Sequence, residues 1–132
     1  MSKNKELRFI GTIHSTLKSI EDCPRQEKEG APAATIEVFD EFVEGLRDIK
    51  PGDELYLFTW LHKADRKVLE TRPRNDHRLP LTGVFSTRSP DRPNPIGIHH
   101  VKVIEVLNGK QFSVSNLEVL DGTPLIDIKP FL

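Results

Sequence analysis

Apolar and polar residues alternate along two stretches in the first half of the chain, as is typical of half-buried β-strands. The first stretch runs from Leu7 to Ile13 and ends at His14-Ser15; the second runs from Ala34 to Asp40. A third stretch, Glu54 to His62, is a nearly continuous apolar run that follows the turn signal Pro51-Gly52-Asp53. Continuous apolar runs of strand length are typical of strands covered on both faces, so we expect this one to be central.

The second half of the chain predicts a hairpin. Ile98 to Leu107 and Gln111 to Asn116 flank Asn108-Gly109, a dipeptide that strongly favours a tight turn between two strands. The apolar positions of the first of these strands change register near Val103-Ile104, which predicts a bulge. Upstream, Val68 to Thr71 is a candidate short edge strand.

Helical periodicity is nearly absent. Glu41 to Arg47 predicts one short helical turn, with an apolar side and a stop near Gly45. At least six strands, one helical turn and no alternation of strands with helices indicate an all-β barrel or sandwich. A chain of 132 residues is sufficient for one such core, so residues 1–132 are expected to form a single domain.

Two long loops interrupt this pattern. Lys18 to Ala33 is polar and aperiodic, and loops of this length are often functional. Gly83 to Gly97 contains three prolines in six residues, and it predicts a stiff extended loop entered from a short strand, Val84 to Thr87. Its rigidity would hold two arginines and an asparagine in fixed directions, which suits ligand binding. On residue types alone, a proline-rich connector with solvated arginines is about equally supported.

Composition and charge narrow the class of protein. The chain is 36% hydrophobic and 30% charged, and no apolar run approaches the ~20 residues of a membrane span. Its single cysteine, Cys23, excludes an internal disulfide, and with no signal-peptide pattern we expect a reducing, cytoplasmic setting. Behind the net charge of −1, residues 37–54 carry seven acids against two bases, whereas residues 63–92 carry eight bases against four acids. This basic flank favours a nucleic-acid partner, although on charge alone a solvated basic loop is the slightly favoured explanation.

The proline-rich stretch Gly83 to Gly97 closely resembles the signature GvFaTRSPxRPNPIG of the TsaA/TrmO (YaeB-like) family. Leu117 to Phe131 resembles the second family signature, DGTPxxDIKPY, with Phe131 at a position where relatives have tyrosine. Shorter matches occur at Ile13-His14-Ser15, at Cys23 to Gln26 and at Trp60-Leu61-His62. Members of this family are S-adenosylmethionine-dependent methyltransferases that methylate N6 of threonylcarbamoyladenosine at position 37 of tRNA.

The resemblance implies a small closed YaeB-like barrel, S-adenosyl-L-methionine as the methyl donor, tRNA as a partner and a homodimer. It also implies which residues bind the donor: Pro24, Arg25, Gln26, His62, Lys63, Arg88, Ile98, Glu118, Val119, Leu120 and Asp121. For contacts with the substrate we expect Arg72, Arg74, Arg92 and Asn94. These residue types suit a donor that carries a cationic sulfonium, a carboxylate and an adenine ring.

The catalytic residue is not evident from the sequence. Methyl transfer is an in-line displacement for which positioning supplies most of the acceleration, so a weak base or water can take the N6 proton. Asp121 and Asp127 are the candidate bases. The histidines and the cysteine lack metal-ligand spacing, so no metal is expected.

Two alternatives remain open. The chain could be a donor-binding module without transferase activity, or it could methylate a small molecule. Both stay open because bacterial relatives often continue into a further C-terminal region implicated in substrate contact, whereas this chain stops at Leu132, directly after the second signature.

Overall fold

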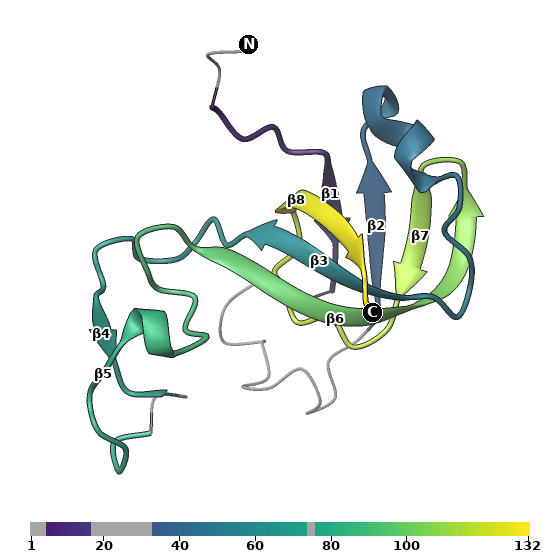
Figure 1. Ribbon diagram of the computed structural model, residues 1–132. Coiled ribbons are helices and arrows are strands. Elements are labelled where there is room, and N and C mark those ends of the chain that lie inside the picture. Colours follow the sequence, from purple (N-terminus) through teal and green to yellow (C-terminus); the bar gives the residue numbers. More distant parts are fainter. Residues whose placement is uncertain (1–4, 17–32, 74–75) are drawn as a thin grey trace.

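The computed structural model describes residues 5–16, 33–73 and 76–132 (Figure 1). Within these residues, one antiparallel sheet contains six strands: β1 (Gly11–His14), β2 (Ala34–Val38), β3 (Glu54–Trp60), β6 (Ile96–Asn108), β7 (Gln111–Val114) and β8 (Thr123–Pro130). A separate two-stranded sheet pairs β4 (Glu70–Thr71) with β5 (Thr82–Gly83). The described elements also include the 3₁₀ helices η2 (Asp40–Leu46) and η4 (Val84–Ser86). The all-β class and the short helical turn are therefore confirmed.

The strand order β1-β2-β7-β6-β3-β8 closes into a barrel, because β8 pairs with β3 on one side and with β1 on the other. The longest strand, β6, runs from the β4–β5 sheet across the molecule to the hairpin with β7 (Figure 1). The register of that hairpin shifts between Val103 and Glu105, which confirms the predicted bulge. In Figure 1 the β4–β5 sheet stands apart from the barrel, beside the end where β6 begins.

The interior of the barrel is filled by alternate residues of its strands. Ile13 of β1, Ile36 of β2, Leu57 of β3, Val114 of β7 and Leu125 of β8 are each 0% exposed. Burial of one such side chain contributes roughly 1.5–3 kcal/mol. The period-two pattern of the sequence thus identifies the face of each strand that forms the core.

The expectation that β3 is covered on both faces is wrong. Its burial alternates: Leu55, Leu57 and Thr59 point inward, whereas Tyr56, Phe58 and Trp60 are only half-buried. The reason is that a barrel has one interior. The outward aromatic residues contact other aromatic side chains: the Tyr56 and Phe58 rings lie 6.4 Å apart, and the Trp60 ring lies 6.5 Å from that of Phe9.

Two predicted strands have different bounds. The first strand begins only at Gly11, where a Cβ would lie 2.1 Å from the backbone oxygen of Glu37 and would prevent the close approach of β1 and β2. The strand predicted at Val84 to Thr87 is wrong, because Val84–Ser86 form the 3₁₀ helix η4, and the strand β5 ends at Gly83. The edge strand predicted within Val68 to Thr71 is confirmed as β4. In the described part of the chain, no helix is long and apolar enough to cross a membrane.

Candidate functional site

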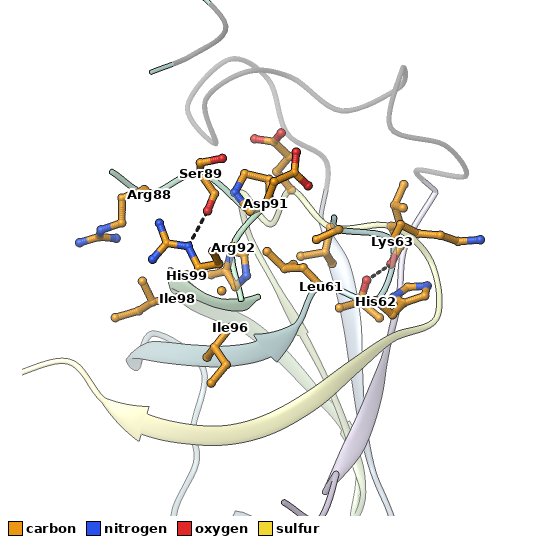
Figure 2. Close-up of a pocket in the computed structure, with 17 residues that line it drawn as sticks. Leu61, His62, Lys63, Arg88, Ser89, Asp91, Arg92, Ile96, Ile98 and His99 are labelled. Carbon is orange, nitrogen blue, oxygen red and sulfur yellow. Dashed lines mark hydrogen bonds between the residues drawn. The ribbon is translucent and has the colours of Figure 1, made fainter. Parts of the chain in front are cut away.

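A cavity of about 580 Å³ opens at the end of the barrel where β3 ends and β6 begins. Its walls come from four segments: residues 61–64 after β3, residues 88–92 of the proline-rich loop, residues 96–99 of β6, and residues 118–120 together with Thr123. Figure 2 shows Arg88 and Arg92 toward one side of this cavity and His62 and Lys63 toward the other, with Leu61 between them. Predicted donor-binding residues that line the cavity are His62, Lys63, Arg88, Ile98, Glu118, Val119 and Leu120.

Two hydrogen bonds donated by backbone N–H groups join the wall after β3 to the proline-rich loop. The Leu61 N–H donates to the Pro95 carbonyl oxygen at 2.8 Å, and the Asp65 N–H donates to Asp91 Oδ1 at 2.8 Å. Proline supplies carbonyl acceptors without competing donors, so the loop is held in an extended path against the end of β3. The two segments that carry His62 and Arg88 are thereby held together.

Arg92 fixes the internal shape of the loop. Its Nε donates to the Ser89 carbonyl oxygen at 2.7 Å (Figure 2), and its Nη2 donates to the carbonyl oxygens of Val84, at 2.7 Å, and Thr87. A planar guanidinium suits this role because its donors have a fixed fork geometry. The sequence did not indicate this structural role, and the predicted contact of Arg92 with substrate stays a prediction.

Arg88 differs from Arg92 although both belong to the same loop. Arg88 is exposed and lines the cavity, and among the described residues its side chain has neither a hydrogen bond nor an ion pair. Its charge is therefore available to a ligand.

The basic flank is largely bonded to itself. Arg66 donates to the Pro93 carbonyl oxygen at 2.7 Å and to Asn94 Oδ1 at 3.2 Å, and Arg72 donates to the Leu79 carbonyl oxygen at 2.7 Å. Arg78 makes two hydrogen bonds to the carboxylate of Asp76, which raise the pKa of Arg78. These hydrogen bonds hold the segment between β3 and β5 in its conformation. A phosphate group of a nucleic acid would therefore have to bind guanidinium groups that already donate hydrogen bonds within the protein. Arg74 lies outside the described residues.

The two candidate bases each accept a hydrogen bond from a backbone N–H group. Asp121 Oδ1 accepts a hydrogen bond from the Ser15 N–H at 2.9 Å, which ties the segment before β8 to the end of β1. Asp127 is exposed on β8, where its Oδ1 accepts the Ile128 N–H at 2.9 Å. Neither residue, nor Asn94, is among the described residues that line the cavity. Their predicted roles stay untested, and Pro24, Arg25 and Gln26 lie outside the described residues.

One lining residue that the sequence did not single out is His99. It is 7% exposed, and its Nε2 lies 2.9 Å from Thr59 Oγ1 in a buried hydrogen bond. The signal that could have identified it is the alternation along β6, because His99 occupies the same inward face as Val101 and Val103. A titratable residue at an inward position is uncommon enough to need a structural reason.

The chemistry of the lining is mixed. Arg88 and Lys63 supply positive charge, Asp91 and Glu118 supply carboxylates, and aliphatic side chains such as Leu61 supply apolar surface. This combination suits a ligand that has an anion, a cation and a ring system. Within residues 5–16, 33–73 and 76–132, no three metal-ligating side chains gather into a group.

Comparison with known proteins identifies relatives of the whole domain. Residues 12–132 match the family model described as tRNA-methyltransferase O N-terminal domain. A probable S-adenosyl-L-methionine-binding protein of Archaeoglobus fulgidus is 42% identical over 126 residues, which cover 96% of this chain and 34% of that protein. One of the same description from Methanocaldococcus jannaschii is 47% identical over 100 residues, covering 73% of this chain and 79% of that protein. The crystal structure of TrmO from Pseudomonas aeruginosa aligns with a TM-score of 0.75 at 30% identity, covering 98% of this chain and 56% of that one.

Proposed function

The chain belongs to the tRNA-methyltransferase O N-terminal domain family, and from this premise we propose that it is an S-adenosyl-L-methionine-dependent methyltransferase that acts on N6 of threonylcarbamoyladenosine at position 37 of tRNA. The observation that carries the proposal is the cavity itself. Residues from separate segments of the chain, among them His62, Arg88 and Glu118, line one space at the open end of the barrel. The cavity volume of about 580 Å³ falls within the range of small-molecule sites, roughly 300–1,000 Å³.

The lining fits the methyl donor group by group. The guanidinium of Arg88 suits the donor carboxylate, because a charge-assisted hydrogen bond to a carboxylate is among the stronger polar contacts. Glu118 suits the cationic end, and the aliphatic side chains of Leu61, Ile98 and Leu120 suit the adenine ring. The donor, when bound, supplies an electrophilic methyl group on a positively charged sulfur.

The protein's own contribution is positioning. Arg92 holds the proline-rich loop through three backbone carbonyls, so Arg88 projects from a fixed backbone. Orientation of two reactants can account for much of the acceleration of a bimolecular step. The N6 proton leaves to a weak base or to water, and Asp121 and Asp127 remain the proposed bases.

The proposed substrate adds features for recognition. Threonylcarbamoyladenosine has a carboxylate, a hydroxyl and a ureido group beside N6, and we assign contacts with it or with the tRNA to Arg72, Arg74, Arg92 and Asn94. A homodimer and a cytoplasmic location belong to the same proposal. The chain spans about half of the solved TrmO chain, so the activity of the full-length relatives is carried over here as a proposal.

A second candidate function is a donor-binding module that transfers no methyl group. It is favoured by the descriptions of the relatives, which name S-adenosyl-L-methionine binding and no reaction. The two candidates share one site and differ only in whether methyl transfer occurs once the donor has bound.

One assay separates them. The protein is incubated with donor and with tRNA that carries threonylcarbamoyladenosine or lacks it, the tRNA is digested, and the nucleosides are analysed by mass spectrometry. The proposal predicts a gain of one methyl group on the modified adenosine alone, and loss of that product in Arg88→Ala. Donor binding without any methylated nucleoside would establish the binding module, and methyl transfer only to a small metabolite would establish a different substrate.

A further inference from the structure

The turn after β3 and the proline-rich loop are joined by hydrogen bonds in which the turn donates and the loop accepts. Two of these bonds come from backbone N–H groups and reach Asp91 and Pro95. Two more come from Arg66, whose Nε donates to the Pro93 carbonyl oxygen at 2.7 Å and whose Nη2 donates to Asn94 Oδ1 at 3.2 Å. This direction suits a loop whose prolines have carbonyl oxygens but no N–H groups.

Arg66 also contacts the end of the barrel. Its guanidinium carbon lies over the ring of Trp60, 5.0 Å from the ring centre, which is within the range of a cation–π contact. Trp60 is the last residue of β3, and it pairs with Ile96 of β6 at the edge of the cavity. A planar guanidinium can lie against a ring while the N–H groups along its edge donate to oxygen acceptors. Arg66 therefore connects the proline-rich loop to the end of β3.

Arg66 and Arg92 hold the loop in different ways. The three hydrogen bonds of Arg92 end on carbonyl oxygens within η4 and the loop, so they fix the internal shape of the loop. The two hydrogen bonds of Arg66 cross from the turn after β3 to the loop, although Arg66 is not among the described residues that line the cavity. Figure 2 shows Arg88 and the His62-Lys63 pair on opposite sides of that cavity. Their separation thus depends on a residue outside the lining.

We propose that Arg66 is a positioning residue for donor binding: against Trp60, it holds the proline-rich loop where Arg88 reaches the donor. This rests on the proposal that the cavity binds S-adenosyl-L-methionine, and it adds a residue that acts without contacting that ligand. Without the Arg66 guanidinium the loop keeps its internal shape, because Arg92 fixes that shape separately. It loses its fixed place relative to the end of β3, and a displaced Arg88 binds less well because hydrogen bonds weaken steeply with poor geometry.

The first test is calorimetric titration of S-adenosyl-L-methionine, without tRNA, below the melting temperature of every variant. Arg66→Ala should weaken donor binding roughly tenfold. Arg66→Lys should weaken it nearly as much, because an ammonium group keeps the charge but lacks the planar fork. Arg78→Lys is the matched control: Arg78 lies in the same segment, its side chain bonds to Asp76 rather than to the loop, and the variant should bind the donor as wild type does.

A double-mutant cycle shows whether Arg66 acts through Arg88. If Arg66 positions Arg88, then Arg66→Ala should cost less than about twofold in donor affinity once Arg88→Ala is present, because the group to be positioned is gone. If the two losses multiply instead, Arg66 acts on the donor independently of Arg88, and the proposal is wrong. Full donor affinity in Arg66→Lys would also contradict it, because positive charge alone would then account for the effect.

Trp60 provides an optical readout of the contact, because it is the only tryptophan in the chain. In Arg66→Ala the ring loses the guanidinium that lies over it. Acrylamide should therefore quench the fluorescence of Trp60 more strongly than in wild type, before any donor is added. A loss of stability alone would not change the quenching of protein that is still folded, so this measurement separates the contact from a general effect on the fold.

The outcomes distinguish this inference from the donor site on which it rests. If Arg88→Ala weakens donor binding but Arg66→Ala binds the donor as wild type does, the positioning role is wrong and the donor site stands. Unchanged quenching of Trp60 in Arg66→Ala would likewise contradict the positioning role alone. Wild-type protein that does not bind the donor, or Arg88→Ala that binds it with full affinity, overturns the proposed donor site and this inference together.

Discussion

Arg88 and Arg92 stand four residues apart in one loop, and the structure predicts opposite consequences for their loss. Arg92 donates to the carbonyl oxygens of Ser89, Val84 and Thr87, whereas Arg88 has no such contact among the described residues. Arg92→Ala should therefore destabilise the fold, and Arg88→Ala should weaken donor binding without destabilising it. The comparison is internally matched, because residue type and loop are the same.

The magnitude for Arg92 follows from its three hydrogen bonds. Each contributes about 1 kcal/mol net at a half-buried position, so their loss should cost about 3 kcal/mol. For a domain of this size that lowers the melting temperature by roughly 10 °C. Arg92→Lys should lose most of this stabilisation too, because an ammonium group keeps the charge but lacks the planar fork that reaches several carbonyls.

For Arg88→Ala, loss of a charge-assisted hydrogen bond should weaken donor binding by about 1.5–3 kcal/mol, or roughly ten- to hundredfold. Thermal unfolding followed by circular dichroism and titration calorimetry measure the two effects separately. Unchanged melting of Arg92→Ala would refute the structural role given to its guanidinium. Unchanged donor affinity of Arg88→Ala would remove Arg88 from the donor site.

Three further predictions concern the fold and its ligand. Gly11→Ala should destabilise the protein by about 3 kcal/mol, because its Cβ would lie 2.1 Å from the Glu37 backbone oxygen. Gly45→Ala, with nothing within 4 Å, should melt as wild type does, and equal melting of the two variants would contradict the pairing of β1 with β2. Donor at a hundredfold excess over its dissociation constant should add about 2.7 kcal/mol of stability, and an unshifted melting curve would argue against binding to the folded chain. Light scattering at micromolar concentration should give the mass of two chains, and the mass of one chain would count against the homodimer.

The elements that the sequence predicted well are those that short-range signals specify. The alternation from Ala34 to Asp40 identified β2, and Asn108-Gly109 placed the β6–β7 hairpin, because both signals are local. The apolar run from Glu54 to His62 correctly located β3, but the prediction that both faces of this strand are buried was wrong. Outward aromatic residues are as apolar as core residues, so composition cannot distinguish contact with other surface rings from a second covering layer.

In the candidate site, too, the sequence predicted only what local signals and the family signatures specify. Rim residues such as His62 were identified through a family signature, and the fold brings them to one cavity with Arg88. The internal role of Arg92 could not be predicted, because it depends on carbonyl groups whose directions only the folded loop defines. The same holds for η4, which forms where the sequence predicted a strand. Its Val84 carbonyl oxygen accepts hydrogen bonds from both Thr87 Oγ1 and Arg92.

The most direct test of the donor site is a crystal structure of the protein with S-adenosyl-L-methionine. We predict electron density for the donor in the cavity between Arg88 and the His62-Lys63 pair, with the donor carboxylate within hydrogen-bonding distance of the Arg88 guanidinium. Density for the donor anywhere else on the chain, or a bound donor that leaves Arg88 without contact, would contradict this placement.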